Sequence, residues 1–156
     1  MSRYTATVSW VNKGPDFLKN KYSRAHQWKF DGGCLINASA APDIVPPPWS
    51  VTENVDPEEA FVASLASCHM LFFLSFAVKH GYLLESYTDN AEGKMEKNQD
   101  GKMAITEVSL HPETVFSGEK TPDHEGLAKL HHLAHEHCFI ANSVTTKVAI
   151  VLNNSD

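Results

Sequence analysis

The sequence is short of positive charge and of cysteine. Its 156 residues include 13 Lys and Arg against 19 Asp and Glu, which gives a formal net charge of −6, and the basic residues form no run. Nucleic acids and anionic membranes attract clustered positive charge, so we expect neither as a partner. The three cysteines are too few and too far apart for a disulfide-stapled secreted scaffold. The polar start, MSRYTATVSW, lacks the apolar stretch of a signal peptide, and we therefore expect a cytoplasmic protein.

Several common catalytic motifs are also missing. The sequence contains no GxxxxGK loop that would cradle phosphates and no GxSxG turn that would present a nucleophilic serine. It contains neither CxxC nor HExxH, two spacings typical of metal sites. We therefore expect no cofactor, and the chemistry that remains to be considered is that of sulfur.

The longest apolar stretch covers residues 60–78, which include no Asp, Glu, Lys or Arg. This approaches the roughly 20 residues of a membrane span, but several Ser residues interrupt it and a helix start signal precedes it. Asp56 is a typical N-cap, Pro57 suits the first helical position, and Glu59 completes a capping-box pattern. Gly81 supplies a stop. We predict the buried central helix of a small domain rather than a membrane span.

The rest of the chain predicts strands and one more helix. Alternation of apolar and polar residues predicts three strands before the central helix, and a proline-rich stretch between them and the helix predicts a stiff loop. A turn signal after the helix predicts a long hairpin, followed by a second helix at about residues 122–137. The predicted strands are residues 4–10, 22–30, 34–39, 87–97, 102–114 and 144–152. The order βββ-α-ββ-α-β indicates an α+β fold, with antiparallel sheets around the central helix, in a single domain of residues 1–156.

The three cysteines occupy different predicted positions. Cys68 lies in the middle of the central helix, and Cys138 lies at the end of the second helix. Free cysteines are commonly buried as small hydrophobic side chains, so ordinary core thiols are one interpretation of both. Cys34 follows a tight turn at the start of a strand, and we interpret it as a packing residue.

A reactive thiol must be a thiolate near neutral pH, which requires a nearby cation, a helix N-terminus or a metal. The middle of a helix gives Cys68 no help from the helix dipole, so the fold would have to bring a cation to it. Arg24 is our candidate because it falls on the same predicted strand face as Trp28 and Phe30. An arginine on an apolar face is costly unless it is paired. The alternative is that this face is the solvent side of an edge strand.

A metal site is a second interpretation of the same region. His131, His135 and Cys138 fall at positions i, i+4 and i+7 of the second predicted helix, which places three ligand-type residues on one face. His69, next to Cys68, would supply a fourth ligand. The alternative is that these histidines form an ordinary solvated helix face.

The segment DPEEAFVASLASCH, residues 56–69, resembles the OsmC/Ohr family, named for osmotically inducible protein C and organic hydroperoxide resistance protein. It is similar to that family's Pro-Glu opening of a long helix, with a cysteine ten positions after the first Glu. A second cysteine near the end of a later helix and the order of the elements also fit, so the resemblance covers nearly the whole chain.

The resemblance implies a thiol-dependent peroxidase that reduces organic hydroperoxides as an intertwined homodimer, with its active sites at the subunit interface. By this resemblance Cys68 is the peroxidatic cysteine and Cys138 the resolving one, and they form a disulfide that an external thiol reductant restores. Glu58 is then the carboxylate that holds an arginine, for which we choose Arg24, against the thiolate. The sequence departs from the family at Phe139, where proline often follows the second cysteine.

Two other functions remain as alternatives. The first is a redox-sensing or ligand-binding dimer that uses the same thiols without turnover. The second is a protein that binds a metal through its His and Cys residues. Consumption of peroxide by the purified protein would distinguish the enzyme from both.

Overall fold

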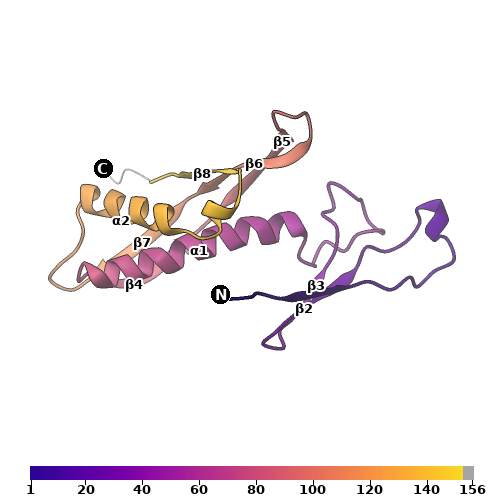
Figure 1. The fold of residues 1–156 in the computed structure, drawn as a ribbon, viewed down its shortest axis with the longest axis horizontal. Coiled ribbons are helices and arrows are strands. Elements are labelled where there is room, and N and C mark those ends of the chain that lie inside the picture. The colour runs from indigo at the N-terminus through magenta and orange to yellow at the C-terminus, as the bar shows by residue number, and fades with distance from the viewer. Residues whose placement is uncertain (153–156) are drawn as a thin grey trace. The chain divides into compact units, whose positions relative to one another are not determined.

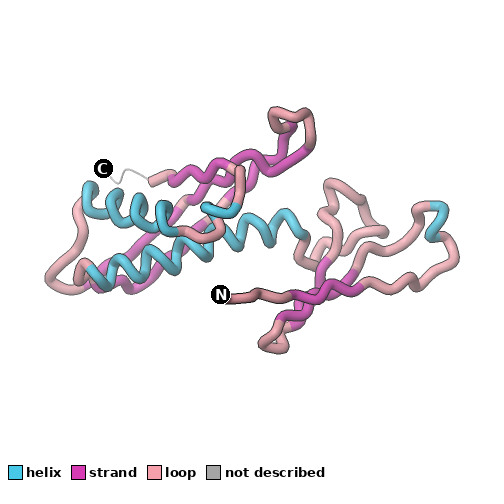
Figure 2. The backbone as a smooth tube through the Cα atoms, in the orientation of Figure 1, coloured by secondary structure: helices cyan, strands magenta, loops and turns pink. Residues whose placement is uncertain are grey.

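The structure, a computed structural model, describes residues 1–152. The chain forms two compact units, Met1–Ala60 and the part from Phe61 onward (Figure 1). Each unit combines strands with connecting loops, and helix α1 (Pro57–Lys79) begins in the first unit and runs through the second (Figure 2). The α+β prediction is confirmed. The single domain of residues 1–156 stays a prediction, and its last four residues lie outside the described part.

The N-terminal unit contains the three strands that alternation predicted, although they are shorter than expected. They are β1 (Ala6–Ser9), β2 (His26–Phe30) and β3 (Leu35–Ala38), paired antiparallel in that order, with one 3-10 turn, η1 (Phe17–Lys19), between the first two. Arg24 lies two residues before β2, so the prediction that it shares a strand face was wrong. Its backbone N–H donates to the carbonyl of Trp49 at 2.8 Å, in the proline-rich loop, instead of to a strand.

The start and the end of α1 follow the local chemistry of the sequence. The Glu59 N–H donates to Asp56 Oδ1 at 2.8 Å, and the Asp56 N–H donates to Glu59 Oε2 at 3.3 Å, which is the predicted capping box. At the other end Gly81 adopts a φ of 73°, which is strained for residues with a Cβ. The N–H of Tyr82 donates to the carbonyl of Ala77 at 3.0 Å, completing a Schellman motif.

Helix α1 buries one stripe rather than its whole circumference. The buried residues Leu65, His69, Phe73 and Ala77 follow one another at intervals of four, which places them on one face. By length and hydropathy alone the helix could cross a membrane, and 28% of its most apolar window is buried within the molecule. Core helices of soluble proteins pass the same test. The predicted central helix is therefore present, and within the single chain it is buried along one face.

The predicted hairpin after α1 is present, but each of its long strands is divided in two. The segments are β4 (Leu83–Asp89), β5 (Glu92–Lys97), β6 (Met103–Leu110) and β7 (Pro112–Ser117), and β5 pairs with β6 while β4 pairs with β7. At the division the His111 N–H donates to the side chain of Asp89 at 2.7 Å rather than to a strand carbonyl. Pro112 has no N–H that could donate a hydrogen bond to a neighbouring strand. The pairing of β5 with β6 therefore ends here, and β4 and β7 pair in a separate sheet.

The last two elements complete the C-terminal unit. Helix α2 (His124–His137) begins at Asp123, whose side chain accepts the Gly126 N–H at 2.8 Å. A 3-10 turn, η2 (Ala141–Ser143), leads to strand β8 (Lys147–Ile150), which pairs parallel with β6. This pairing was not expected, because antiparallel sheets were predicted throughout.

Two apolar clusters form the core of the C-terminal unit. One packs Leu65 of α1 against Val108 and Leu110 of β6. The other packs Phe73 of α1 against Leu130 and Ala134 of α2, with β4 and β7 side chains around them. Full burial of a Leu or Phe side chain stabilises the fold by about 1.5–3 kcal/mol. These clusters hold α1, α2 and β4 together around the region that contains the cysteines and histidines.

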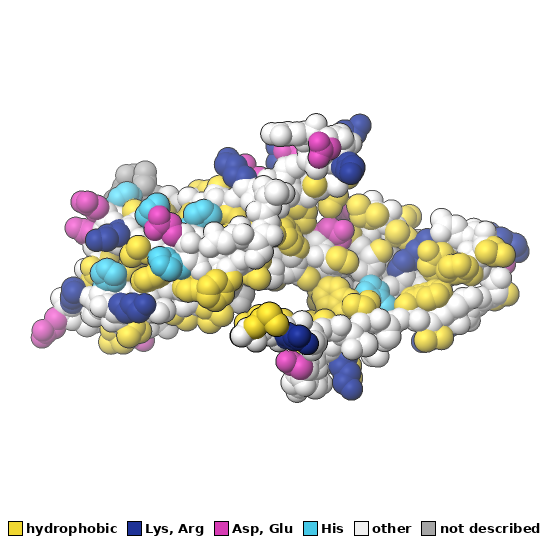
Figure 3. Space-filling model, viewed as in Figure 1, with side chains coloured by type: hydrophobic (Ala, Val, Ile, Leu, Met, Phe, Trp, Pro, Cys, Tyr) yellow, Lys and Arg dark blue, Asp and Glu magenta, His cyan; other side chains and the backbone are white. Residues whose placement is uncertain are grey.

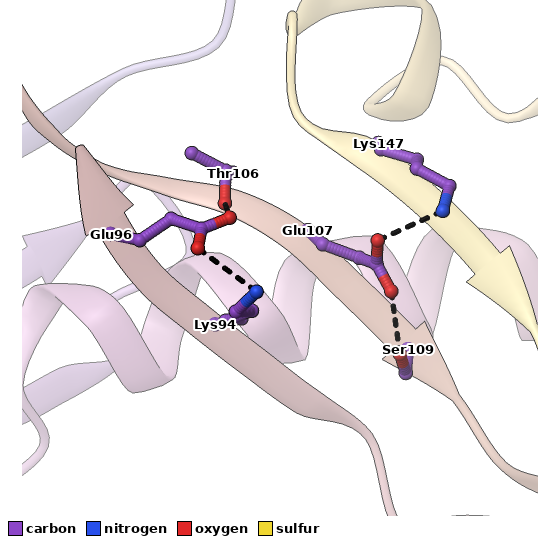
Figure 4. Close-up of polar contacts among 6 residues, drawn as sticks. All are labelled: Lys94, Glu96, Thr106, Glu107, Ser109 and Lys147. Carbon is purple, nitrogen blue, oxygen red and sulfur yellow. Dashed lines mark hydrogen bonds and ion pairs between the residues drawn. The ribbon is translucent and has the colours of Figure 1, made fainter. Parts of the chain in front are cut away.

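The outer face of the β5-β6-β8 sheet carries exposed polar pairs (Figure 4). Lys94 pairs with Glu96 at 2.9 Å, and Lys147 of β8 pairs with Glu107 of β6 at the same distance. Exposed ion pairs contribute little to stability, about 0–1 kcal/mol. The face is therefore a solvated surface, and its cross-strand pair Lys147–Glu107 agrees with the observed register.

Candidate active site

Cys68 lies in the middle of α1, and its side chain is partly exposed. The next residue, His69, belongs to the buried stripe and contacts α2. Since a helix turns about 100° per residue, Cys68 lies at the edge of the face that α1 turns toward α2. Cys68 is therefore partly exposed beside the buried face of the helix.

Cys138 is the C-cap residue of α2, and only 1% of it is exposed. Its N–H donates to the carbonyl of His135 at 3.2 Å, which fixes the backbone at the end of the helix. The N–H of Ala141, in the turn that follows, donates to its sulfur at 3.4 Å. Burial raises the pKa of the Cys138 thiol, the Ala141 N–H acts in the opposite direction, and the neighbouring Cys68 raises it further.

The structure brings Cys68 and Cys138 together. Both are free thiols, and they lie close enough that, beyond the effect of burial, Cys68 raises the pKa of Cys138. An aromatic contact between Phe72 of α1 and Phe139, with ring centroids 4.9 Å apart, holds the same two segments together. Phe139, the departure from the family pattern, is thus part of the packing beside the two thiols. A disulfide requires such proximity, but the assignment of peroxidatic and resolving roles stays a prediction.

Arg24 belongs to the N-terminal unit, where its guanidinium is held by neutral groups. It donates to the carbonyl of Tyr22 and to Asn20 Oδ1, both at 2.6 Å, and it lies 3.7 Å above the ring centroid of Tyr22. Arg24 and Tyr22, together with Trp10 and Phe17, line an open hollow of about 470 Å³ in that unit. Hydrophobic side chains are prominent on the visible face of the same unit (Figure 3).

Glu58 lies in the first turn of α1. Its Oε2 atom is buried and has no hydrogen-bond partner in the part of the chain that the structure describes. None of the ion pairs within residues 1–152 joins Glu58 to Arg24. The structure therefore does not form the Glu58–Arg24 pair that the resemblance implies, and both roles stay predictions. A buried carboxylate oxygen without a hydrogen-bond partner is costly, and Glu58 has one such atom within the single chain.

Cys34 is exposed. It follows Gly33, which takes a φ of 86° in the turn between β2 and β3, and its carbonyl accepts the Phe30 N–H at 3.0 Å. The interpretation of Cys34 as a packing residue was therefore wrong. Its thiol lies in the N-terminal unit, and both other cysteines lie in the C-terminal unit.

Two buried histidines form a pair that the sequence did not predict. His69 Nε2 and His131 Nδ1 are 3.0 Å apart, and their rings lie parallel, with an interplanar angle of 5°. Burial lowers the pKa of His69 to about 4, with a smaller effect from His135, and burial lowers the pKa of His131 to about 3, with a smaller effect from His69. Both rings are therefore neutral at pH 7. The only indication of this pair in the sequence was the predicted grouping of His131, His135 and Cys138 on one helix face, with His69 beside Cys68.

The metal interpretation of that face is not supported by the geometry. Across the described residues, no three His, Cys, Asp or Glu side chains gather as ligands of one metal ion. The ring of His131 turns its Nδ1 atom to His69 instead. The geometry of the described residues therefore gives no support to a metal held by His69, His131, His135 and Cys138.

Comparison with known proteins agrees with this fold. The family described as OsmC-like protein matches residues 52–153. An OsmC-like protein of unknown function from Vibrio cholerae is 58% identical to this chain, covers 98% of it over 100% of its own length, and superposes with a TM-score of 0.96. No curated protein sequence matches the chain.

More distant structures share the fold alone. An organic hydroperoxide resistance protein from Elizabethkingia anophelis is 16% identical, with a TM-score of 0.74, and covers 99% of this chain and 98% of its own. The organic hydroperoxide resistance protein OhrB of Bacillus subtilis is 22% identical, with a TM-score of 0.67, and covers 96% of this chain and 98% of its own. From the family match and the close relative, the chain belongs to the OsmC-like family.

Proposed function

We propose that this protein is a thiol-dependent peroxidase that reduces organic hydroperoxides. The observation that carries the proposal is the closeness of a partly exposed thiol, Cys68, to a buried thiol, Cys138, whose pKa it raises beyond the effect of burial. An attacking thiol has to meet a peroxide from solvent, and a resolving thiol has to be close and shielded. Proteins of the same fold carry the name organic hydroperoxide resistance protein, which supports the choice of substrate class.

In the proposed reaction the Cys68 thiolate attacks the terminal peroxide oxygen. The S–O bond forms, the O–O bond breaks, and the alkoxide takes a proton and leaves as an alcohol. The Cys138 sulfur then attacks the sulfur of the sulfenic acid, forming the disulfide and releasing water. A dithiol reductant returns both cysteines to thiols and is itself oxidised to a disulfide, so that no cofactor is needed.

We further propose that Arg24 completes the site. The guanidinium would hydrogen-bond the departing oxygen and favour the thiolate, and the hollow beside it has aromatic walls suited to an apolar group on the peroxide. Two features support pairing with Glu58: its buried Oε2 accepts no hydrogen bond from residues 1–152, and none of the ion pairs formed there involves Arg24.

We propose a homodimer, in which a second copy supplies Arg24 and Glu58 to the thiol pair. The exposed apolar side chains of α1 support this assembly, since Leu71 is 59% and Val78 is 76% exposed in the single chain. The two residues are seven positions apart and so lie on one face of α1. Exposed apolar surface gathered on one face is typical of interaction sites, and two-fold dimers are the commonest closed assembly. A cytoplasmic location, where thiol reductants are available, fits the same proposal.

The decisive experiment measures turnover of cumene hydroperoxide by the purified protein with dithiothreitol as the reductant. We expect multiple turnovers by the parent protein, none by Cys68→Ser, and a rate within a few-fold of the parent for Cys34→Ser, which serves as the matched control. Oxidation of one equivalent of thiol without further turnover would favour the redox-sensing alternative. Unchanged turnover by Cys68→Ser would contradict the proposal.

A further inference from the structure

Five polar side chains meet where α1, α2 and β4 pack together. This buried polar cluster consists of His69, His131, His135, Tyr87 and Asp89, and each of them has one buried polar atom that no other described residue hydrogen-bonds. Only two further residues in the described part of the chain, Ser50 and Glu58, have such an atom. Leaving a buried polar atom unpaired costs about 1–3 kcal/mol. Their concentration in one place therefore indicates a function rather than a packing role.

The side chains of the cluster follow one another across the core. His135 lies close enough to His69 to lower its pKa, and His69 is hydrogen-bonded to His131. The ring of Tyr87 lies 6.4 Å from that of His131, centroid to centroid. Burial raises the pKa of Tyr87, and the nearby carboxylate of Asp89 raises it further. Asp89 is only partly buried. The cluster thus leads from the end of α2 that carries Cys138 to the surface at the end of β4.

The geometry of the His69–His131 pair allows a proton to cross it without leaving a charge behind. In one tautomer, His131 Nδ1–H donates to His69 Nε2, and the second proton of the pair is on His69 Nδ1. When His131 Nε2 receives a proton, the shared proton moves to His69 and His69 Nδ1 releases its own, so both rings end neutral. The two outer atoms, His69 Nδ1 and His131 Nε2, are the ones left without partners.

From this geometry we propose that His69 and His131, with His135 and Tyr87 at the two ends, form a proton relay that serves the buried Cys138 sulfur. The inference rests on the proposed peroxidase function. Two placements connect the relay to the thiols: His69 follows Cys68 directly on α1, and on α2 His131 and His135 lie on the same face as Cys138.

The reduction step is where such a relay is needed. A dithiothreitol thiolate attacks the accessible sulfur of Cys68, a new S–S bond forms, and the Cys68–Cys138 bond breaks with its electron pair passing to Cys138. The leaving sulfur is buried, and burial raises the pKa of its thiol, so it has to take up a proton as it leaves. The second dithiothreitol thiol then closes the ring of the oxidised reductant and releases Cys68. The relay supplies the proton that Cys138 takes up.

The test uses the isosteric variant Tyr87→Phe, which keeps the ring and removes the hydroxyl. Protein oxidised to the Cys68–Cys138 disulfide is mixed with dithiothreitol, and the rate of reduction is followed in H2O and D2O. We expect Tyr87→Phe to slow reduction by on the order of 10-fold or more and to change the solvent isotope effect. Tyr82→Phe is the matched control, because Tyr82 packs against the same apolar cluster, and it should stay within about twofold of the parent rate.

The possible results distinguish a proton relay from a structural role of the Tyr87 hydroxyl. A purely structural role would lower the unfolding free energy without changing the isotope effect, and that result would overturn the proposal. Failure of the parent protein to form the disulfide with hydroperoxide would instead refute the peroxidase function. Normal disulfide formation with reduction kinetics unchanged in Tyr87→Phe would refute the relay alone.

A second measurement needs no variant. In ¹⁵N NMR spectra of the parent protein at pH 7, we expect His69 and His131 to be neutral and in the same tautomer, either both Nε2–H or both Nδ1–H. That pairing is the only neutral arrangement that places a single proton between Nε2 of His69 and Nδ1 of His131. An imidazolium at either position, or opposite tautomers, would contradict the relay.

Discussion

Mild acid should destabilise the folded protein through the His69–His131 pair. Both rings are buried, 1% and 2% exposed, and burial is the main reason that their pKa values fall to about 4 and about 3. In the unfolded chain each imidazole has an ordinary pKa of about 6.5. As the pH falls below that value, the histidines bind protons in the unfolded state but not in the folded state. The free energy of unfolding therefore decreases.

The expected loss follows from these pKa values. At pH 5 an unfolded histidine is almost fully protonated, while both folded rings are still mostly neutral. The linkage relation then gives a loss of about 2 kcal/mol per histidine between pH 7.5 and pH 5, or about 4 kcal/mol for the pair. A domain of ordinary stability has about 5–15 kcal/mol in total, so the loss is large. Below about pH 4 the folded rings begin to bind protons, and the loss levels off.

Urea unfolding at pH 7.5 and pH 5 measures this loss directly. The double variant His69→Leu/His131→Leu replaces both partners with apolar side chains of similar size, which leaves no buried group unpaired within the pair. We expect it to lose about 4 kcal/mol less than the parent between the two pH values. The exposed His124, changed to Gln, is the control and should behave as the parent does. Equal losses in the parent and the double variant would refute the reasoning.

Single contacts give three further predictions. Gly93→Ala should lower the unfolding free energy by about 1–3 kcal/mol in urea unfolding, because the new Cβ would lie 2.6 Å from Val62 Cγ2; an unchanged midpoint would contradict this. Asp56→Ala removes the N-cap of α1 and should cost about 1 kcal/mol in the same assay, whereas no loss would mean that the cap is dispensable. Arg24→Ala should reduce hydroperoxide turnover at least 10-fold, while Arg3→Ala should not; equal effects would mean that the wrong arginine was chosen.

The elements that the sequence predicted best are those set by neighbouring residues. The N-cap at Asp56 and the stop at Gly81 are local, and the structure confirms both. The turn after β5 is also local: Asn98 Oδ1 accepts the N–H groups of Asp100 and Lys102 at 3.0 Å. In each case a few adjacent residues determine the backbone conformation.

The sequence did not predict the strand boundaries that depend on residues far apart in the chain. The division of the hairpin depends on Asp89 and His111, which are 22 positions apart in the sequence. The start of β2 depends on the hydrogen bond from the Arg24 N–H to the carbonyl of Trp49 in another segment. Alternation of apolar residues continues through both places, so the sequence pattern gives no sign that the ladder stops.

The same distinction between neighbouring and distant residues applies to the candidate site. Cys68 and Cys138 could be named from their helix positions and the family resemblance, and the structure brings them together. The His69–His131 pair joins residues 62 positions apart, and a single sequence shows only that each lies on a helix. Whether a histidine is exposed or is buried against another one depends on how α1 and α2 pack.

Hydroperoxide should join Cys68 and Cys138 within one chain, and peptide mapping tests this central claim most directly. The reduced protein is treated with one equivalent of cumene hydroperoxide, the remaining thiols are alkylated, and the digest is analysed by mass spectrometry without reduction. We predict an intramolecular Cys68–Cys138 disulfide that dithiothreitol reverses, with Cys34 recovered as the alkylated thiol. Disulfides that contain only Cys34, or Cys68 and Cys138 both recovered alkylated after the peroxide has been consumed, would contradict the claim.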